Sequence, residues 1–174
     1  GIFKLRASDL GRPLDDIATE FQAGLERGYK KFVLLGEDIG AYGIDTGTNI
    51  CELLEKILGF DDDYTVFLND FNPRWLKGAH NELLRMLKQH HQKIDRLLLP
   101  LQSGSDRILA AMNRQYTVKD VVPIITALKN QLPELKIETH IMVGFPGETD
   151  EDFELSRRLL QSCRFDYVNI YKYE

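Results

Sequence analysis

The feature that most constrains the fold is a repeated alternation of apolar runs with helical patterns. Five strand-like runs follow one another along the chain, and each reads as a continuous apolar stretch; they occupy residues 31–35, 64–68, 94–99, 137–143 and 167–171. Continuous apolar strands separated by helices are typical of parallel sheets. The sequence therefore predicts an α/β fold in which helices cover a parallel sheet.

Helix boundaries are marked by residues that suit helix ends. The first helix is expected to open at residues 12–17, where Pro13 suits a first turn, and to stop at Gly28. Later helices are expected to begin after a polar capping residue. The expected caps are Asn49, Ser105, Thr117 and Thr149, for helices that end near Leu58, Met112, Gln131 and Cys163.

Chain length limits how complete the fold can be. A chain of 174 residues is enough for one domain with a sizeable core, whereas a closed eight-stranded barrel typically takes ~250 residues. The pattern also opens on a helix with no strand ahead of it. We therefore expect a single domain over residues 1–174, a partial (βα)6 TIM-like barrel of parallel strands that is incomplete at its N-terminus and lacks the first strand.

Charge and apolar content bear on the class of partner. The formal net charge is −5, whereas proteins that bind nucleic acid on their own are usually basic, so this acidic chain gives no direct nucleic-acid signal. No apolar run reaches the ~18 residues that span a bilayer, and no secretory signal opens the chain. We expect a cytoplasmic protein without a membrane partner.

Cysteine and histidine give no metal-site pattern. Cys51 and Cys163 lack paired ligand spacing, and free cysteines are usually buried. Of the four histidines, His140 lies within a strand-like run; it could face inward, but a satisfied core histidine is favoured. We therefore assign no metal ligand in this chain.

Polar and glycine-rich segments follow the strand-like runs. They are residues 35–43 (LGEDIGAYG), 72–73 (NP), 99–106 (LPLQSGSD) and 143–149 (VGFPGET). Ligands of parallel α/β folds bind at the carboxyl ends of the strands, so a site is expected where these segments meet. With residues 112–114 (MNR), the ordered set resembles the radical S-adenosylmethionine methylthiotransferases over residues 2–173. Residues 37–43 and 72–73 resemble the branch that acts on the adenosine next to the anticodon more than the branch that acts on a ribosomal protein.

The resemblance also implies what stands before the chain. The family begins with a strand and a CxxxCxxC loop whose thiolates hold a [4Fe–4S] cluster, and S-adenosylmethionine chelates the fourth iron. Residues 12–17 (RPLDDI) match a segment that follows the third cysteine by about a dozen residues. Counting back from Pro13 places that cysteine directly before Gly1. The cluster loop is therefore expected to be absent, and the chain is expected to lack ligands for the cluster.

The resemblance assigns roles at the cofactor site. Glu37 is expected to accept from the ammonium of S-adenosylmethionine, and Arg114 to pair with its carboxylate. Gln102 and Ser103 are expected to hydrogen-bond the ribose hydroxyls or the amino-acid end. The alternative for Glu37 is a solvated loop acid or a helix cap. The alternative for Gln102 and Ser103 is a capping turn, and the alternative for Arg114 is an arginine on the surface without a ligand.

Further positions complete the expected site. The backbone groups of Val143 and Gly144 are expected to contact adenine, and Asn72 is expected to face the substrate. Asp38 is a weaker cofactor candidate than Glu37. For Glu148 a structural role in the first turn of the following helix is favoured.

The implied function is C–H activation and methylthio insertion into tRNA, with tRNA as a partner of the intact protein. This chain alone is expected to be inactive, and removal of an edge strand is expected to cause self-association. Three alternatives stay open. They are another radical S-adenosylmethionine enzyme such as a methyltransferase, a degenerate non-catalytic binding module, and an unrelated phosphate-binding barrel, which the lack of a GxxxxGK[ST] loop disfavours.

Overall fold

The computed structural model describes residues 1–7 and 12–174, without the side chains of residues 78–81. Its strands are β1 (Ile2–Arg6), β2 (Lys31–Leu35), β3 (Thr65–Leu68), β4 (Ile94–Leu98), β5 (Lys136–Val143) and β6 (Tyr167–Lys172). Its α-helices are α1 (Leu14–Glu26), α2 (Ile50–Leu58), α3 (Leu76–Gln89), α4 (Asp106–Ala111), α5 (Val118–Gln131) and α6 (Asp150–Cys163). The short 3₁₀ helices are η1 (Ile39–Ala41) and η2 (Pro73–Trp75).

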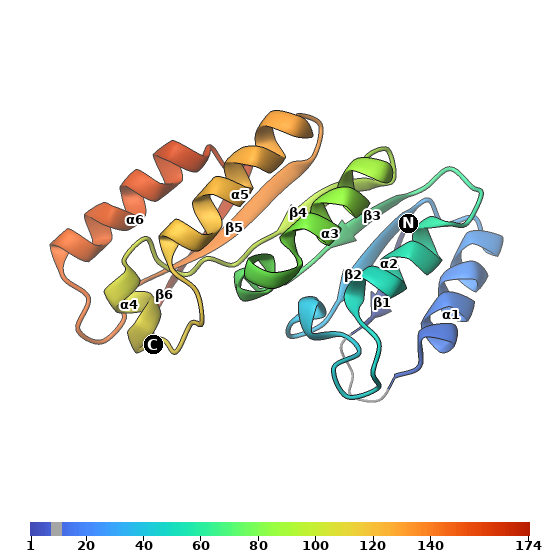
Figure 1. The fold of residues 1–174 in the computed structure, drawn as a ribbon, viewed down its shortest axis with the longest axis horizontal. Helices are drawn as coiled ribbons and strands as arrows, with labels where there is room; N and C mark the ends of the chain where they lie inside the picture. The colour runs from blue at the N-terminus through green and yellow to red at the C-terminus, as the bar shows by residue number, and fades with distance from the viewer. Residues whose placement is uncertain (8–11) are drawn as a thin grey trace.

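The strands form one sheet in the order of the chain. The order is β1-β2-β3-β4-β5-β6, and every neighbouring pair is parallel (Figure 1). Each crossover carries at least one helix, which confirms the α/β fold with parallel strands. Within the described part of the chain, β1 and β6 are the two edges of an open, strongly twisted sheet.

The chain opens on a strand, so the expectation of a first helix with no strand ahead of it was wrong. Strand β1 pairs with β2 from Ile2 opposite Lys31 to Arg6 opposite Leu35. Its sequence, IFKLR, alternates apolar and cationic residues, unlike the continuous apolar runs by which the other strands were predicted. Phe3 and Leu5 point to the core, and the cations of β1 point away from it.

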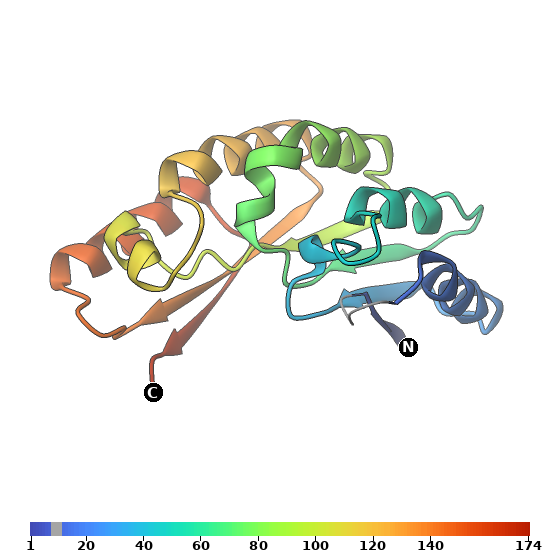
Figure 2. The same cartoon turned by 60° about the horizontal axis from the view of Figure 1, so that its bottom comes forward.

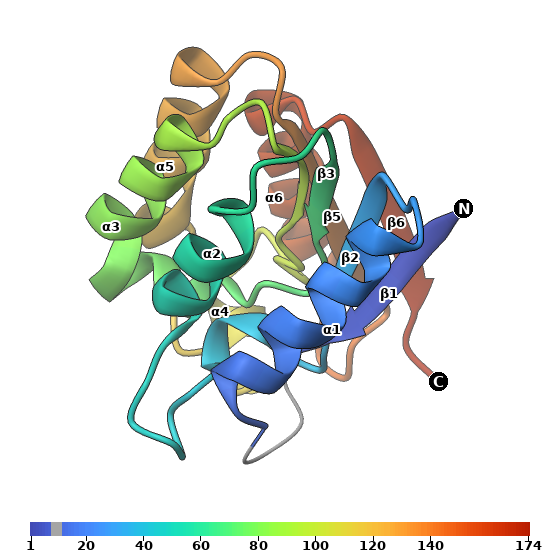
Figure 3. The same ribbon diagram turned by 90° about the vertical axis from the view of Figure 1, so that its right-hand side faces the viewer.

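Helices cover only one face of the sheet (Figures 2 and 3). Strand β5 shows the consequence, because Ile137, Thr139 and Ile141 are buried while Glu138 and His140 are only half-buried. The expectation of continuous apolar strands under helices therefore holds for one face alone. The other face, which we call the open face, carries the residues that point away from the helices.

The predicted helix ends are confirmed. Asn49 accepts from the backbone N–H of Glu52 at 3.0 Å, and Ser105 and Thr149 cap α4 and α6 in the same way. Thr117 and the first turn of α5 form a capping box. Gly28 follows α1 with φ +81°, a left-handed conformation that glycine adopts without the cost of a side chain. Because these bonds satisfy the free N–H groups of helix ends, local sequence is enough to place the boundaries.

The core lies between the helices and the sheet. Around β2, the stacked rings of Phe21 and Phe32 have centroids 4.1 Å apart, and Tyr64 meets both edge-on. The Tyr64 hydroxyl donates to the carbonyl of Ile57 at 2.6 Å, which satisfies the one polar atom of this cluster. Cys51 and Cys163 are free and buried, as expected.

Candidate functional site

Three neighbouring strands end in residues with left-handed backbone. Asp70 follows β3 with φ 59°, Gln102 follows β4 with φ 70°, and Gly144 follows β5 with φ 76°. Side-chain-bearing residues rarely adopt this conformation, and they keep it where the surrounding structure requires it, often at ligand sites. The carboxyl ends of β3, β4 and β5 are therefore the candidate site.

Gln102 is held firmly by its backbone. Its N–H donates to the carbonyl of His140 and its own carbonyl accepts from Met142, both at 2.8 Å, so it bridges to β5. Its side-chain Oε1 is buried and has no hydrogen-bond partner among the described residues. A buried acceptor without a donor costs roughly 1–3 kcal/mol. A ligand hydroxyl or ammonium would supply the missing donor.

Arg114 carries a second buried atom without a partner. It follows Asn113, which has φ 56°, and its backbone N–H donates to the carbonyl of Leu109 at 2.8 Å. Its side chain is half-buried, and Nε has no acceptor among the described residues. A guanidinium in this state suits an anionic group such as a carboxylate.

Ser103 turns toward the helices. It is 1% exposed, its Oγ lies 3.3 Å from Oγ of Ser156 on α6, and it accepts from the N–H of Ser105 at 3.1 Å. Gly104 approaches the same helix, because a Cβ there would lie 2.5 Å from the carbonyl oxygen of Leu155. This glycine permits close packing on α6. Cofactor contact by Ser103 stays a prediction.

A charged network ties the segment after β4 to α6. The Ser105 hydroxyl donates to Asp152 at 2.6 Å, and Arg107 and Thr149 also bond to that carboxylate. The Ser105 bond and then the Arg107 bond hold the pKa of Asp152 well below its usual range. The network could not be predicted from the sequence. An acid in the first turn of a helix is favoured by the helix dipole alone, so Asp152 gave no sign of a distant partner.

The turn after β5 already uses two of the backbone groups expected to contact adenine. The Gly144 N–H donates to the Glu148 carboxylate, and the Val143 carbonyl accepts from Tyr173 at 2.9 Å. Contact of Val143 and Gly144 with adenine stays a prediction. Glu148 lies just before the cap Thr149 and outside the helix, which corrects its expected place in the first turn. The carboxylate closes the turn, so its role here is structural.

Asp38 joins the segments that follow β2 and β3. Its Oδ1 accepts from the N–H groups of Gly40 at 3.1 Å and Asn72 at 3.2 Å. Its Oδ2 accepts from Arg74 at 3.0 Å and from the Trp75 indole at 2.9 Å. With both oxygens engaged, the carboxylate is a structural junction.

Glu37 and Asn72 lie beside this junction. Glu37 is exposed in the loop after β2. The Asn72 Oδ1 accepts from the backbone N–H of Arg74 at 3.1 Å and so caps η2. Both residues are at the expected edge of the sheet, and their contacts with ammonium and with substrate stay predictions.

A polar cluster that sequence reasoning missed lies on the open face near the same edge. His140 Nε2 is 3.3 Å from the Asn169 amide nitrogen, and the ring meets Tyr171 edge-on at 5.1 Å. Burial lowers the pKa of His140, although Asp70 opposes this effect, and burial raises the pKa of Asp70. His140 is therefore half-buried at the open face, which corrects its expected place in the core. The sequence could have indicated this position only if it had shown which residues of β5 point away from the helices.

Comparison with known proteins identifies the family. The sequence profile of the Radical SAM superfamily matches residues 8–160. The chain belongs to this superfamily. The similar solved structure of archaeal Elp3 from Methanocaldococcus infernus, with an N-terminal deletion (1–46), has a TM-score of 0.60 at 16% identity. The match covers 99% of this chain and 46% of that one, and it shows the fold alone.

Radical SAM relatives of higher identity are tRNA methylthiotransferases by name, and the chain resembles them. Threonylcarbamoyladenosine tRNA methylthiotransferase MtaB of Thermotoga maritima is 34% identical over 93% of this chain. The tRNA-2-methylthio-N(6)-dimethylallyladenosine synthase of Opitutus terrae is 37% identical over 98% of it. The chain spans 37% and 36% of these two relatives, so it corresponds to about a third of their length.

The chemistry of S-adenosylmethionine, the cofactor of radical SAM proteins, fits the partnerless atoms. Its hydroxyls and ammonium are donors for Gln102 Oε1, and its carboxylate is an acceptor for Arg114 Nε. The residues present do not fit a [4Fe–4S] cluster in the same way. The cluster of this superfamily needs three thiolates, and the chain has two cysteines, one in α2 and one in α6. Among the side chains that the structure describes, no group of three from His, Cys, Asp or Glu could hold a metal ion.

Among the helices of this radical SAM core that the structure describes, none is both long and apolar enough to cross a membrane.

Proposed function

We propose that residues 1–174 form a single core domain, the S-adenosylmethionine-binding part of a tRNA methylthiotransferase that acts in the cytoplasm. The observation that carries this proposal is that Gln102, shortly after β4, and Arg114, shortly after α4, each keep a buried atom without a partner among the described residues, Oε1 and Nε respectively. The names of the relatives, which modify tRNA, support the choice of substrate.

In this proposal each strand end holds one part of the cofactor. Gln102 accepts from a ribose hydroxyl or the ammonium, Arg114 binds the carboxylate, and Glu37 adds a second acceptor for the ammonium. The turn at Gly144 borders adenine, and Asn72 faces the substrate base. The rigid bridge between Gln102 and β5 fixes the acceptor in place, which limits the entropy lost on binding.

The cofactor and a [4Fe–4S] cluster together supply C–H activation when both are bound. The residues of this chain orient the amino-acid and ribose ends and exclude water from them. Because its two cysteines cannot supply a cluster, we propose that the chain alone is inactive as a transferase.

Calorimetric titration with S-adenosylmethionine tests the binding role. We expect weak binding that Gln102→Leu reduces by about threefold to tenfold, since a neutral hydrogen bond contributes about 0.5–1.5 kcal/mol. Arg114→Gln removes a charge-assisted bond and should reduce affinity by about tenfold or more. Arg158→Gln, on the exposed side of α6, is the matched control. Equal affinities for all four proteins would refute the assignment.

A second experiment tests the reaction class. The chain is extended by its own upstream coding sequence, reconstituted anaerobically with iron and sulfide, and followed by visible absorption and EPR. A [4Fe–4S] signal that changes with S-adenosylmethionine supports the proposal. Failure to find upstream cysteines, or to form a cluster, favours the non-catalytic binding module. Incubation of the reconstituted protein with tRNA then separates methylthio insertion from methyl transfer by product mass.

A further inference from the structure

The open face of the sheet gathers positive charge that the sequence scatters. Lys4 of β1, Lys31 of β2, Arg96 of β4 and Lys136 of β5 are all exposed. Strand register places Lys4, Val33, Phe67, Arg96 and Lys136 in one row across five strands, and Lys31 lies two residues before Val33, toward the amino end of β2. At about 4.8 Å between strands, the row from Lys4 to Lys136 spans roughly 19 Å.

These cations are weakly neutralised. Lys4, Lys31 and Lys136 form no ion pair or hydrogen bond through their side chains with any described residue. Arg96 shares its charge with Glu138 at 3.4 Å and lies over the Phe67 ring at 5.0 Å. Asp95 lies beside a hollow of ≈ 100 Å³ between Lys31 and Arg96, and Asp166 is close enough to Lys136 for their charges to interact. Positive charge therefore exceeds negative charge on this face of an acidic chain.

Aromatic rings accompany the cations. Tyr167 and Tyr171 of β6 lie on the same face, opposite Glu138 and Met142, and are 55% and 48% exposed. A basic sheet face with exposed rings matches the way proteins bind single-stranded nucleic acid, in which cations follow the phosphates and bases stack on aromatic side chains.

We propose that the open face binds a single-stranded segment of RNA. Lys4, Lys31 and Lys136, with Arg96, contact the phosphates, and Tyr167 and Tyr171 support the bases. The inference deepens the proposed function, on which it rests for the choice of RNA among polyanions. It places the RNA along the sheet, beside the cofactor site at the carboxyl ends of β4 and β5.

The test is binding of a short fluorescently labelled single-stranded RNA, measured by polarisation over a series of salt concentrations. Lys31→Glu combined with Lys136→Glu should weaken binding by about tenfold or more. It should also lower the slope of log affinity against log salt by about 0.7 for each phosphate that is no longer neutralised. Tyr171→Ala should weaken binding by about fivefold or more without changing that slope.

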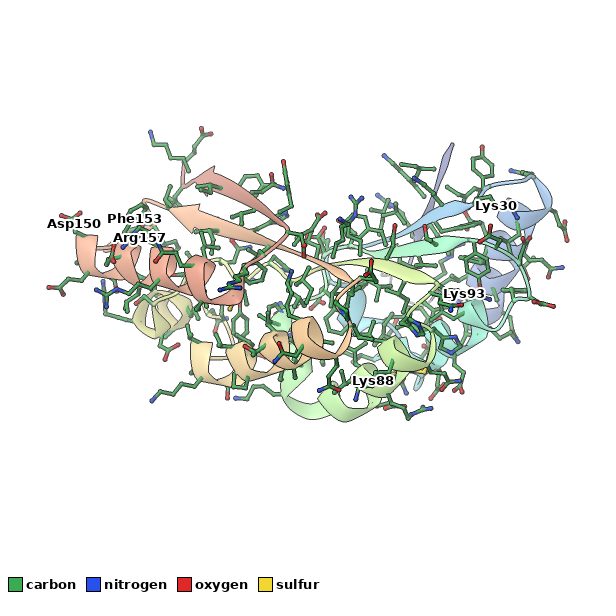
Figure 4. The ribbon with its side chains drawn as sticks, turned by 90° about the horizontal axis from the view of Figure 1, so that it is seen from above. Lys30, Lys88, Lys93, Asp150, Phe153 and Arg157 are labelled. Carbon is green, nitrogen blue, oxygen red and sulfur yellow. The ribbon has the colours of Figure 1, made fainter. Side chains whose placement is uncertain are left out.

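The matched control carries the same charge change on the helix layer. Lys88 of α3 lies on the side of the sheet that the helices cover (Figure 4), and Lys119 of α5 is also exposed. Lys88→Glu with Lys119→Glu should leave affinity within about twofold, since neither lysine touches the open face. Circular dichroism melting establishes that both double variants fold.

Three results would overturn the inference. One is an equal loss for the two double variants, which would indicate a general charge effect. Another is an absence of RNA binding by the unaltered chain. The last is salt-sensitive binding to phosphatidylserine vesicles but not to RNA, which would assign the face to a membrane. Titration of the same proteins with S-adenosylmethionine distinguishes failure of this inference from failure of the proposed function. If the proposed function holds, the open-face variants should bind the cofactor as the unaltered chain does.

Discussion

At the scale of single residues, several polar side chains near the site bond to the protein itself. Asp38 and Asp152 each bring together groups from separate segments, and Ser103 bonds to α6. Gln102 and Arg114 differ, because each keeps a buried atom without a partner among the described residues. Arg74, His90 and Glu148 also keep such an atom, so the position of Gln102 after β4 and of Arg114 after α4, together with the missing partner, makes these two residues candidates for ligand contact.

Asp38→Asn should destabilise the fold. An amide offers one acceptor oxygen in place of two, so the side chain can no longer accept from Gly40, Asn72, Arg74 and Trp75 together. We expect the free energy of unfolding to fall by about 1.5–3 kcal/mol, as for hydrogen bonds to charged groups. Urea unfolding measures this. The exposed Asp61→Asn should change it by less than about 0.5 kcal/mol, and equal effects would contradict the role of Asp38.

Gly104→Ala should destabilise through overpacking. The added Cβ would lie 2.5 Å from the Leu155 carbonyl oxygen and 2.6 Å from the Ser156 Cα, which are backbone atoms of α6. We expect a loss of about 1–3 kcal/mol in thermal or urea unfolding. Gly28→Ala is the comparison for backbone strain alone, because a Cβ there would meet no atom within 4 Å and the residue has φ +81°. We expect it to lower the free energy of unfolding by about 1 kcal/mol. An unchanged stability for Gly104→Ala would show that α6 can move away.

At the scale of elements, the sheet leaves two edges without a described partner. Strand β1 exposes Ile2 at 59%, and β6 exposes Ile170 at 64%. Parallel edge strands offer unpaired backbone groups, and exposed apolar side chains add to the tendency to associate. The self-association expected from the sequence can therefore occur at either edge.

Light scattering over a range of protein concentrations checks this expectation. The unaltered chain should increase in mean mass with concentration, and Ile170→Lys or Ile2→Lys should reduce the increase at the edge that pairs. Ile44→Lys is the matched control, because Ile44 is also 64% exposed but lies in a loop. A monomer at every concentration would contradict the prediction.

At the scale of the whole molecule, protonation of two half-buried histidines links stability to pH. Burial lowers the pKa of His140 and, with help from Lys93, that of His90. The unfolded chain therefore binds more protons than the folded chain between these lowered values and about 6.5. Their contribution to stability is full above about pH 6.5 and is lost as the pH falls toward the folded pKa values.

Urea unfolding at about pH 7.5 and about pH 5.5 measures this dependence. The unaltered chain should be less stable at the lower pH, and a double variant, His90→Asn with His140→Asn, should show a smaller difference. The exposed His91→Asn should behave like the unaltered chain. A pH-independent unaltered chain would disprove the prediction.

Local patterns in the sequence determined most of the elements and their order. Caps such as Asn49 and Thr149 bond within one helical turn, so they could be predicted from the sequence. An apolar run such as residues 31–35 could also be recognised as a strand without knowledge of the strand it pairs with. The position of Gln102 shortly after β4 could be predicted in the same way. Strand β1 escaped prediction because an edge strand buries one face only, and its pattern is short and mixed.

Only the tertiary structure decided which side chains meet. Asp38 lies 36 residues from Arg74, and Ser105 lies 47 residues from Asp152, so neither bond can be predicted from a local sequence pattern. The open face is the clearest case, because strand pairing brings lysines from β1, β2 and β5 onto one face, which the acidic net charge of the chain does not indicate. Sequence determines the chemistry of each residue, whereas sheet pairing and the one-sided helix layer determine which residues share a surface.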